Sequence, residues 1–478
     1  MRIYIDVESS FKCLINRVRL TGIERVEVEI GKVLVARNHT AVVWDPDMIA
    51  YREIPPSSFY DLTTYSGKCD IEAFLTSRQD AAGIRSKDVA QLRLGVALSL
   101  FIPKIGTLRD RFIMRLIVLF GRAARALSIV ERRAIAHLLK LNRRIERRNW
   151  VLAESKKSAA KVDLQAGDVL FVPGPMGDTL ATSHYFAMAE RGVHIVPVIH
   201  DLHPIRSPWT VLIPGADVII AQNLALLSHV SDLVLANSNW TARDATTWYV
   251  EQNLHVPHIV PVPLAAGLRP SAGIAPEQPK DFPFASGRFV LMAGTFSQNK
   301  NQDWAQMLWR RLYERLGDVA WPLVFAGGRG HKQEETIERV QSDLGFGRIM
   351  YWVEAPSDAE LSWLYTHCAF TIVPAEFEGW GLALSEALAF GKPCLSSGRG
   401  ALAEAGQGIV WERDPIDGVA WLDQCSRWMK EPETFTAEQA RVRREYKLRT
   451  WEDVTDEVIQ AIRQHFGSRK LSHRRASF

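Results

Sequence analysis

The chain has 478 residues, of which 47% are apolar and 23% are charged, and its formal net charge is +4. This composition is that of a globular protein with sizeable cores, and the length predicts two domains of ordinary size. A membrane-spanning class is excluded on sequence grounds, because no apolar run approaches the eighteen or so residues that a span requires.

The cysteines and the N-terminal residues bear on the compartment. The five cysteines, at positions 13, 69, 368, 394 and 425, are scattered, odd in number and without metal-ligand spacing. This pattern fits a reducing compartment better than a disulfide framework. Residues 1–7 read as a strand and lack the apolar core of a signal peptide. We therefore expect a cytoplasmic protein.

The first segments of the chain alternate between strand and helix. Residues 2–7 predict a strand, Thr21-Gly22-Ile23 begins a helix that runs to about Arg37, and residues 40–44 predict a second strand. Thr21 is also a plausible N-cap for this helix, since threonine accepts hydrogen bonds from free N–H groups. Asp45-Pro46-Asp47 has the spacing of an acidic metal-binding triplet, but we interpret it as a turn and predict no metal site.

A basic segment interrupts the alternation. Residues 85–148 hold sixteen Lys and Arg against four Asp and Glu, a net charge of +12, so the rest of the chain carries −8. Within it, residues 111–122 set large apolar residues beside arginines, as in helices that lie in the surface of an anionic membrane. A helical insertion packed on its own domain explains the same pattern. Nucleic-acid binding is a third option, but no known module is evident.

We therefore predict a basic helical insertion over residues 85–150 that contacts an anionic membrane through 85–148. The basic tail 467–478 adds to this charge. We predict no nucleic-acid partner.

After the insertion the α/β alternation resumes. Strands are predicted at 167–173, 194–200 and 231–238, with helices at 179–191 and from 239 onward. His200 and Asp201 end the second of these strands, and side chains at the carboxyl ends of parallel strands can face a ligand crevice. Five prolines then interrupt the polar segment 263–287, which predicts a linker and not a core element.

The second half of the chain predicts a doubly wound parallel sheet. Its expected strands and helices alternate. The strands lie near 288–293, 321–326, 348–353, 369–374 and 393–397, and the helices near 302–316, 334–344, 358–367, 382–391 and 415–431. A single helix is predicted to follow, over residues 433–466.

The densest group of candidate site residues follows the predicted strand 369–374. It reads Glu-Gly-Trp-Gly-Leu-Ala-Leu-Ser-Glu over residues 378–386 and leads into a helix. Its two glycines let the backbone approach a ligand closely, and the free N–H groups of the helix start suit a phosphate. Its two glutamates lie in the loop and about one helical turn inside the helix, so they can meet opposite ends of an elongated ligand.

This pattern resembles the signature of the retaining, nucleotide-sugar-dependent glycosyltransferases of family 4. In that family two glutamates bracket a Gly-Phe-Gly-like turn, and here Trp380 replaces the common Phe. The resemblance covers nearly all of residues 288–463 and, more weakly, 1–45 and 167–263. It implies an α/β architecture of two Rossmann-like domains facing across a cleft, the GT-B fold.

The implied domains follow from the predicted elements. They are an acceptor-binding domain over 1–265, a linker over 266–287, a donor-binding domain over 288–432, and a C-terminal helix over 433–466 that crosses back to the first domain.

The resemblance also implies roles for particular residues. Lys300 would neutralise the donor diphosphate, Glu378 would hold hydroxyls of the donor sugar, Glu386 would hold the ribose, and His200 would contact the sugar region. With Glu378 and Lys300, His200 forms the expected catalytic set. The other implied donor contacts are Gly294, Thr295, Arg329, Gly379, Trp380, Gly381 and Leu382, and the acceptor-side residues are Thr21, Gly22 and Asp201.

One implied contact departs from the family pattern. Many relatives carry an arginine just after the glycine at 294, where this chain has Thr295, so half of the usual cationic clamp is missing. Arg329, in the next predicted loop, is a candidate substitute.

The resemblance implies transfer of a hexose from a nucleotide-sugar donor to a glycan or lipid-linked glycan acceptor in surface polysaccharide biosynthesis. It implies retention of configuration, without a metal or other cofactor. The sequence Gly-Thr-x-x-x-x-Lys looks most like mannosyltransferases, so we expect GDP-mannose as the donor. A lipid-linked acceptor would place the enzyme peripherally on the inner face of the plasma membrane.

Two alternative functions remain open at this point. A sugar-nucleotide epimerase or a glycan phosphorylase can share the fold, although the pyridoxal-phosphate lysine motif of a phosphorylase is not evident. A catalytically silent scaffold could instead use the basic insertion to recruit partners at a membrane. The presence of Glu378, Glu386 and Lys300 argues against a catalytically silent scaffold.

Overall fold

The structure is a computed structural model of the chain. It describes residues 1–10, 22–45, 50–54, 56, 59, 161–174, 183–270 and 273–467. Thr21, the Asp45-Pro46-Asp47 turn beyond Asp45, the basic insertion over 85–150 and the basic tail beyond residue 467 lie outside these residues. The elements that carry the candidate site belong to one compact unit, formed by Met1–Ser9, Thr21–Tyr51 and Val162–Phe478.

The first half of the chain forms a sheet with the strand order β4-β3-β2-β1-β5-β6-β7-β8. The pairs from β2 through β1, β5, β6 and β7 to β8 are parallel. The strands are β1 (Ile3–Asp6), β2 (Thr40–Asp45), β3 (Ala50–Ile54), β4 (Lys161–Val162), β5 (Val169–Val172), β6 (His194–Ile199), β7 (Leu233–Ala236) and β8 (His258–Pro261). Continuous apolar runs such as Val169–Val172 are fully buried, as expected for strands covered on both faces.

Helices accompany this sheet. They are α2 (Gly22–Ala36), α8 (Ser183–Glu190), α9 (His203–Arg206), η2 (Pro208–Thr210), α10 (Ala216–Val230) and α11 (Asn239–Glu251). Ser238 caps α11, because its hydroxyl accepts a hydrogen bond from the N–H of Thr241. Neither α10 nor β8 was expected from the sequence pattern. Apolar side chains occur on most sides of α10, so the one-sided period that marks a surface helix is weak there.

The second half forms a sheet with the order β11-β10-β9-β12-β13-β14, and neighbouring strands in it are parallel. The strands are β9 (Val290–Ala293), β10 (Leu323–Gly327), β11 (Met350–Glu354), β12 (Thr371–Val373), β13 (Cys394–Ser396) and β14 (Trp411–Glu412). Numbered from β9, this order is 3-2-1-4-5-6, the order of a Rossmann sheet. The order reverses between β9 and β12, which is where such sheets bind their ligands.

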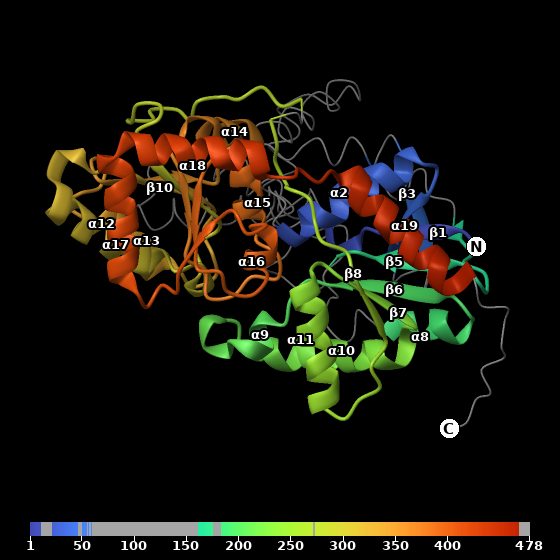
Figure 1. Cartoon of the computed structure of the whole chain (residues 1–478). Coiled ribbons are helices and arrows are strands. Elements are labelled where there is room, and N and C mark those ends of the chain that lie inside the picture. Colours follow the sequence, from blue (N-terminus) through green and yellow to red (C-terminus); the bar gives the residue numbers. More distant parts are fainter. Residues whose placement is uncertain are drawn as a thin grey trace, which may run out of the picture. The chain divides into compact units, whose positions relative to one another are not determined.

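Two groups of helices cover the faces of the second sheet (Figure 1). On one face, α12 (Gln302–Leu316), α13 (Glu334–Gln341) and α17 (Gly418–Lys430) share a core with strand residues such as Phe325. On the other, α14 (Asp358–His367) and α15 (Leu382–Ala389) pack with Phe289 and Leu291. Short elements complete the domain: η3 (Gln298–Lys300), η4 (Gly317–Val319) and α16 (Leu402–Ala405).

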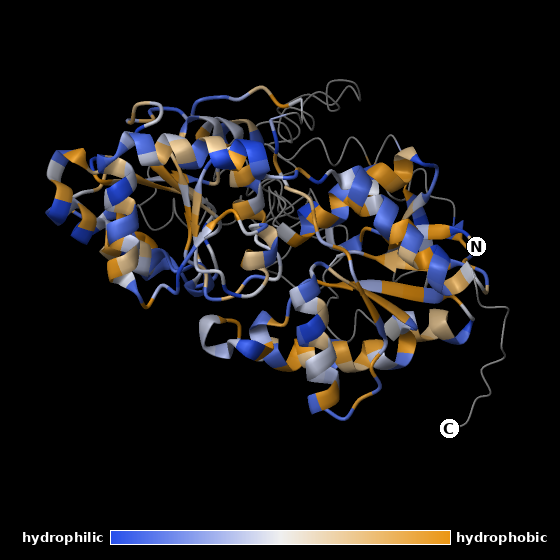
Figure 2. Ribbon diagram, in the orientation of Figure 1, coloured by the Kyte–Doolittle hydropathy of each residue, from blue (hydrophilic) through white to orange (hydrophobic). Residues whose placement is uncertain are grey.

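Hydropathy follows this layering. Strands of both sheets are mostly apolar, whereas many of the helices have one apolar and one polar side (Figure 2). The alternation of strand and helix predicted from sequence, with two parallel sheets, is therefore confirmed. None of the helices in the described part of the chain is both long and apolar enough to cross a bilayer.

The proline-rich segment differs from the expectation in one respect. Between β8 and β9 its described residues form neither helix nor strand, as a linker should. However, Phe282 is 8% exposed and packs in the core with Phe289 and Tyr365. The proline-rich, polar sequence around Phe282 gives no sign of this contact, because a single aromatic residue can enter a core without any periodic pattern around it.

The predicted single C-terminal helix is in fact two helices, and this part of the prediction was wrong. α18 (Pro432–Glu445) ends where Tyr446 is extended, and α19 (Trp451–Gly467) begins after Thr450. Thr450 and Asp453 exchange hydrogen bonds between their side chains and each other's N–H groups, which starts a new helix. α19 contacts elements of the first sheet, since Phe466 stacks on His194 with 4.0 Å between ring centroids.

Candidate functional site

Lys300 and Glu378 meet at the carboxyl ends of β9 and β12. The Lys300 ammonium donates a hydrogen bond to Oε1 of Glu378, and the two side chains are 30% and 13% exposed. Gly294 follows β9 with φ of 142°, a conformation that glycine adopts readily, and the chain then turns into η3. The two charged residues therefore lie 78 positions apart in sequence and in contact at the point where the strand order reverses.

The loop that carries Glu378 is held on several sides. Asn299 donates its amide N–H to the carbonyl oxygen of Phe377 at 2.8 Å, and Thr241 donates its hydroxyl to that of Gly379 at 3.2 Å. Gly379 has no room for a side chain, because a Cβ there would overlap the carbonyl oxygen of His200. The glycine is thus required for close packing of this loop on the end of β6.

The start of α15 combines a glycine with a buried indole. Gly381 adopts φ of 96° and precedes the helix without any side-chain cap. Trp380 is 7% exposed, and within the described residues its indole Nε1 has no hydrogen-bond partner. Leu382 is the first residue of the helix. The four predicted donor contacts of this turn therefore lie where the loop joins α15, and their contact with a donor stays a prediction.

Glu386 is more buried than an acidic side chain that lines an open ligand crevice. It is 6% exposed, and its Oε2 accepts a hydrogen bond from the Tyr365 hydroxyl at 2.8 Å. Burial raises the pKa of Glu386 to about 7, against the opposing effects of the Arg25 guanidinium and the Tyr365 hydroxyl. Arg25, from α2, makes a two-point ion pair with Asp358 at 2.7 and 3.2 Å. The second glutamate of the motif therefore belongs to a buried polar network.

The residues after β6 lie against the same loop. The ring Nε2 of His200 donates to the carbonyl oxygen of Pro173 at 2.6 Å, and burial lowers the His200 pKa. Oδ1 of Asp201 accepts the N–H of His203 at 3.1 Å, and burial raises the pKa of Asp201. His200 and Asp201 were predicted from the sequence, but His203 was missed. It lies only three residues after His200, in the sequence His-Asp-Leu-His, and this short spacing could have indicated it.

Two predicted donor residues are exposed. Thr295 is exposed in the loop after β9. Arg329 forms an ion pair with Glu354 at 2.6 and 3.0 Å, and its guanidinium lies 4.9 Å from the centre of the Trp352 ring. Contact of Arg329 with a donor stays a prediction, and it would require Arg329 to leave or share this carboxylate.

Only some of the residues predicted on the acceptor side lie within the described part of the chain. Gly22 is the first residue of α2, and a Cβ on it would lie 3.5 Å from Cδ1 of Leu382, at the start of α15. Gly22 therefore lies close to the start of α15, and its acceptor-side role stays a prediction. Thr21 lies outside the described residues.

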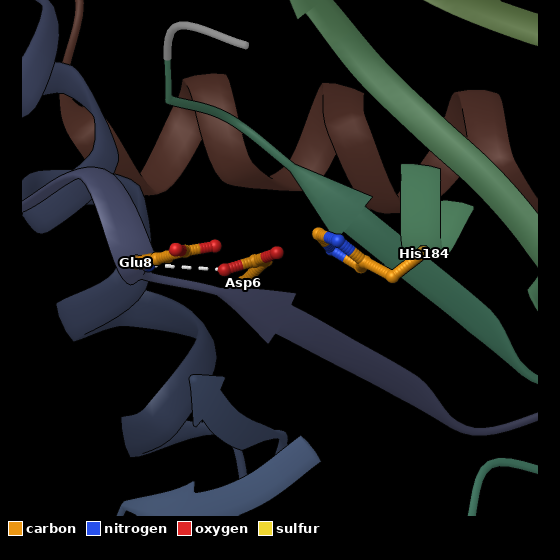
Figure 3. A group of neighbouring side chains, drawn as sticks. All are labelled: Asp6, Glu8 and His184. Carbon is orange, nitrogen blue, oxygen red and sulfur yellow. Dashed lines mark hydrogen bonds between the residues drawn. The ribbon is translucent and has the colours of Figure 1, made fainter. Parts of the chain in front are cut away.

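A second cluster at the end of β1 was not predicted. Asp6, Glu8 and His184 place carboxylate and imidazole atoms within 4.8 Å of one another (Figure 3). Asp6 is buried, and its oxygens accept hydrogen bonds from the Glu8 N–H and from the hydroxyls of Tyr51 and Tyr185. These three donors already satisfy the Asp6 carboxylate, so the arrangement fits a closed hydrogen-bonded network better than a set of metal ligands. Its parts come from β1, β3 and α8, which no local motif connects.

Comparison with known proteins identifies a related segment. Residues 275–407 match the family model described as "Glycosyl transferases group 1". The O-antigen chain mannosyltransferase B of Escherichia coli is 26% identical over 175 residues, 37% of this chain and 45% of that protein. The GDP-mannose:cellobiosyl-diphosphopolyprenol alpha-mannosyltransferase of Xanthomonas oryzae pv. oryzae is 28% identical over 138 residues, 28% of this chain and 36% of that protein.

These alignments span less than half the length of either relative. Among solved structures, sucrose-phosphate synthase from Thermosynechococcus elongatus aligns with a TM-score of 0.47 and 17% identity, over 63% of this chain and 74% of that chain.

Proposed function

We propose that the chain is a glycosyltransferase, because residues 275–407 match the glycosyl transferases group 1 model, and that it transfers mannose from GDP-mannose to a glycan or lipid-linked glycan in surface polysaccharide assembly. The donor and the pathway are supported by similarity to two mannosyltransferases, one named for an O-antigen chain and one for GDP-mannose and a diphosphopolyprenol.

The contact between Lys300 and Glu378 at the reversal point of the second sheet carries this proposal. A bound diphosphate would compete with the Glu378 carboxylate for the Lys300 ammonium. Glu378 would then be released to accept hydrogen bonds from sugar hydroxyls. The ion pair thus keeps both groups in place until a ligand with a negative end and a hydroxylated end replaces each partner.

The proposed chemistry requires stabilisation of the leaving nucleoside diphosphate. The Lys300 ammonium and the N-terminus of α15 would supply positive charge where negative charge develops. We propose retention of configuration through attack on the same face of the sugar, with the departing phosphate as base, and activity without a metal ion. Activity that persists in excess chelator, and an α-linked product by NMR of the anomeric proton, are the expected results.

Nucleotide release with candidate donors tests the function. We expect GDP release from GDP-mannose, dependent on a glycan or lipid-linked acceptor, and no comparable release from UDP-glucose. Calorimetry that shows binding of UDP but not GDP would contradict the proposed donor. Conversion of the sugar nucleotide without transfer would indicate an epimerase, and the absence of turnover with any donor would indicate a scaffold.

The two glutamates give the sharper test. Glu378→Ala should mainly lower kcat, because contacts to the sugar matter most as it flattens in the transition state. Glu386→Ala should mainly weaken nucleotide binding. Since Glu386 is buried against Tyr365, its variant should also lose stability. If both variants keep wild-type kinetics, the two glutamates are not part of the donor site.

We further propose that residues 85–148 attach the enzyme to anionic membranes, which rests on the charge of this segment. Each Lys or Arg near an anionic surface contributes about 1 kcal/mol, and this attraction is screened by salt. Flotation with phosphatidylserine vesicles should show binding that weakens with salt and disappears on deletion of 85–148. An intact chain that stays unbound at low salt would contradict the proposal.

A further inference from the structure

His203 lies beside the Lys300–Glu378 pair and has no role in the sequence motif. Its ring stacks on Phe377, the residue before Glu378, with 5.7 Å between the ring centroids. Its main-chain N–H is held by the Asp201 carboxylate. Both contacts place the imidazole at the edge of the loop that carries Glu378.

The hydrogen bonds of Thr210 decide which ring nitrogen of His203 carries the proton. The Thr210 hydroxyl lies 2.6 Å from Nε2 of His203 and donates to the carbonyl oxygen of Ser207 at 2.8 Å. A hydroxyl has one proton, and a carbonyl oxygen can only accept. Because that proton is used on Ser207, the Thr210 oxygen must accept from Nε2–H. In the neutral ring, Nδ1 therefore carries a lone pair.

The ring is neutral near pH 7, and its Nδ1 has no partner among the described residues. The pKa of His203 is lowered to about 4, first by burial and second by the Lys300 ammonium, and the Glu378 carboxylate opposes both effects. Within the described residues Nδ1 has no hydrogen-bond partner. The His203 side chain is half-buried among the described residues. An uncharged acceptor without a partner among the described residues thus lies near the ion pair.

We propose that His203 binds the transferred sugar, with Nδ1 accepting a hydrogen bond from one of its hydroxyls. The charges of Lys300 and Glu378 both act on the ring, so a sugar that replaces Lys300 on Glu378 would come near it. A neutral acceptor suits the position, because a further carboxylate would repel the diphosphate and an imidazolium could not accept. Thr210 is then a positioning residue that acts through the tautomer of His203. The inference rests on the proposed glycosyl transfer.

The test compares kcat/KM for the intact nucleotide-sugar donor with that for deoxy donors, each lacking a different sugar hydroxyl. In the wild-type chain, the donor that lacks the bound hydroxyl should lose about 3- to 10-fold, the value of one neutral hydrogen bond. In the His203→Ala variant, kcat/KM for this deoxy donor should equal kcat/KM for the intact donor. Loss of any other sugar hydroxyl should lower kcat/KM by the same factor in the wild type and in the variant. If His203 has only a structural role, His203→Ala should lower kcat/KM by the same factor for the intact donor and for every deoxy donor.

Thr210 supplies the second variant pair. Thr210→Val removes the acceptor of Nε2–H and should reduce the discrimination against that one deoxy donor, whereas Thr210→Ser should preserve it. His229→Ala, at an exposed histidine of α10, is the matched control and should match the wild type. An active wild-type enzyme whose deoxy-donor pattern is unchanged in His203→Ala overturns the role of His203 alone. If the wild-type chain turns over no donor, the proposed function and this inference fail together.

Discussion

Replacement of Tyr365 by phenylalanine should destabilise the protein more at high pH than at low pH. The Tyr365 hydroxyl is buried and donates to Glu386 at 2.8 Å, and the pKa of Glu386 is raised to about 7 by burial. Below this pKa the acceptor is a neutral carboxyl, and above it the acceptor is a carboxylate. The same hydroxyl therefore makes a stronger hydrogen bond as the acid ionises.

The magnitudes follow from the charge of the acceptor. A hydrogen bond between neutral groups contributes about 0.5–1.5 kcal/mol and one to a charged group about 1.5–3 kcal/mol. Tyr365→Phe should therefore cost ~1 kcal/mol at pH 5.5 and ~2 kcal/mol at pH 8.5. The difference of ~1 kcal/mol corresponds to a further rise of about 0.7 in the pKa of Glu386. At pH 8.5 the melting temperature should fall by several degrees.

Urea unfolding of wild type and variant at both pH values measures these costs. Tyr249→Phe is the matched control, because Tyr249 is equally buried but donates to the neutral carbonyl oxygen of Leu224 at 2.8 Å. Its cost should not change between pH 5.5 and 8.5. A cost of Tyr365→Phe that is the same at both pH values would refute the claim that Glu386 ionises in the folded protein within this range.

Three further predictions concern other buried contacts. Lys392→Met should cost about 2–4 kcal/mol in urea unfolding, because the buried ammonium binds two main-chain carbonyls at the end of α14 at 2.8 Å; an unchanged midpoint would contradict this. Burial raises the pKa of Asp6 to about 7, so stability should fall as pH rises from about 4 to 7, and Asp6→Asn should flatten that decline in melting temperature. Gly379→Ala should reduce transferase activity at least 10-fold, because its Cβ would overlap His200, whereas Gly328→Ala, with open space around its Cβ, should stay active.

The alternation of strands and helices, and the turn that carries Glu378, could be predicted from the sequence. Buried parallel strands are short apolar runs, and Gly381 marks a backbone conformation that favours glycine. These signals are local, because the pattern and the element that it specifies occupy the same residues. Elements without such a local pattern, such as α10 and the break between α18 and α19, were missed.

Only the tertiary structure decided which groups of the site meet. Lys300 reaches Glu378 because β9 and β12 are neighbours, although two other strands lie between them in sequence. The burial of Glu386 depends on Tyr365, and the tautomer of His203 depends on a threonine in a separate turn. Strand order, burial and proton position depend on residues far apart in the chain. No local sequence pattern could therefore specify them.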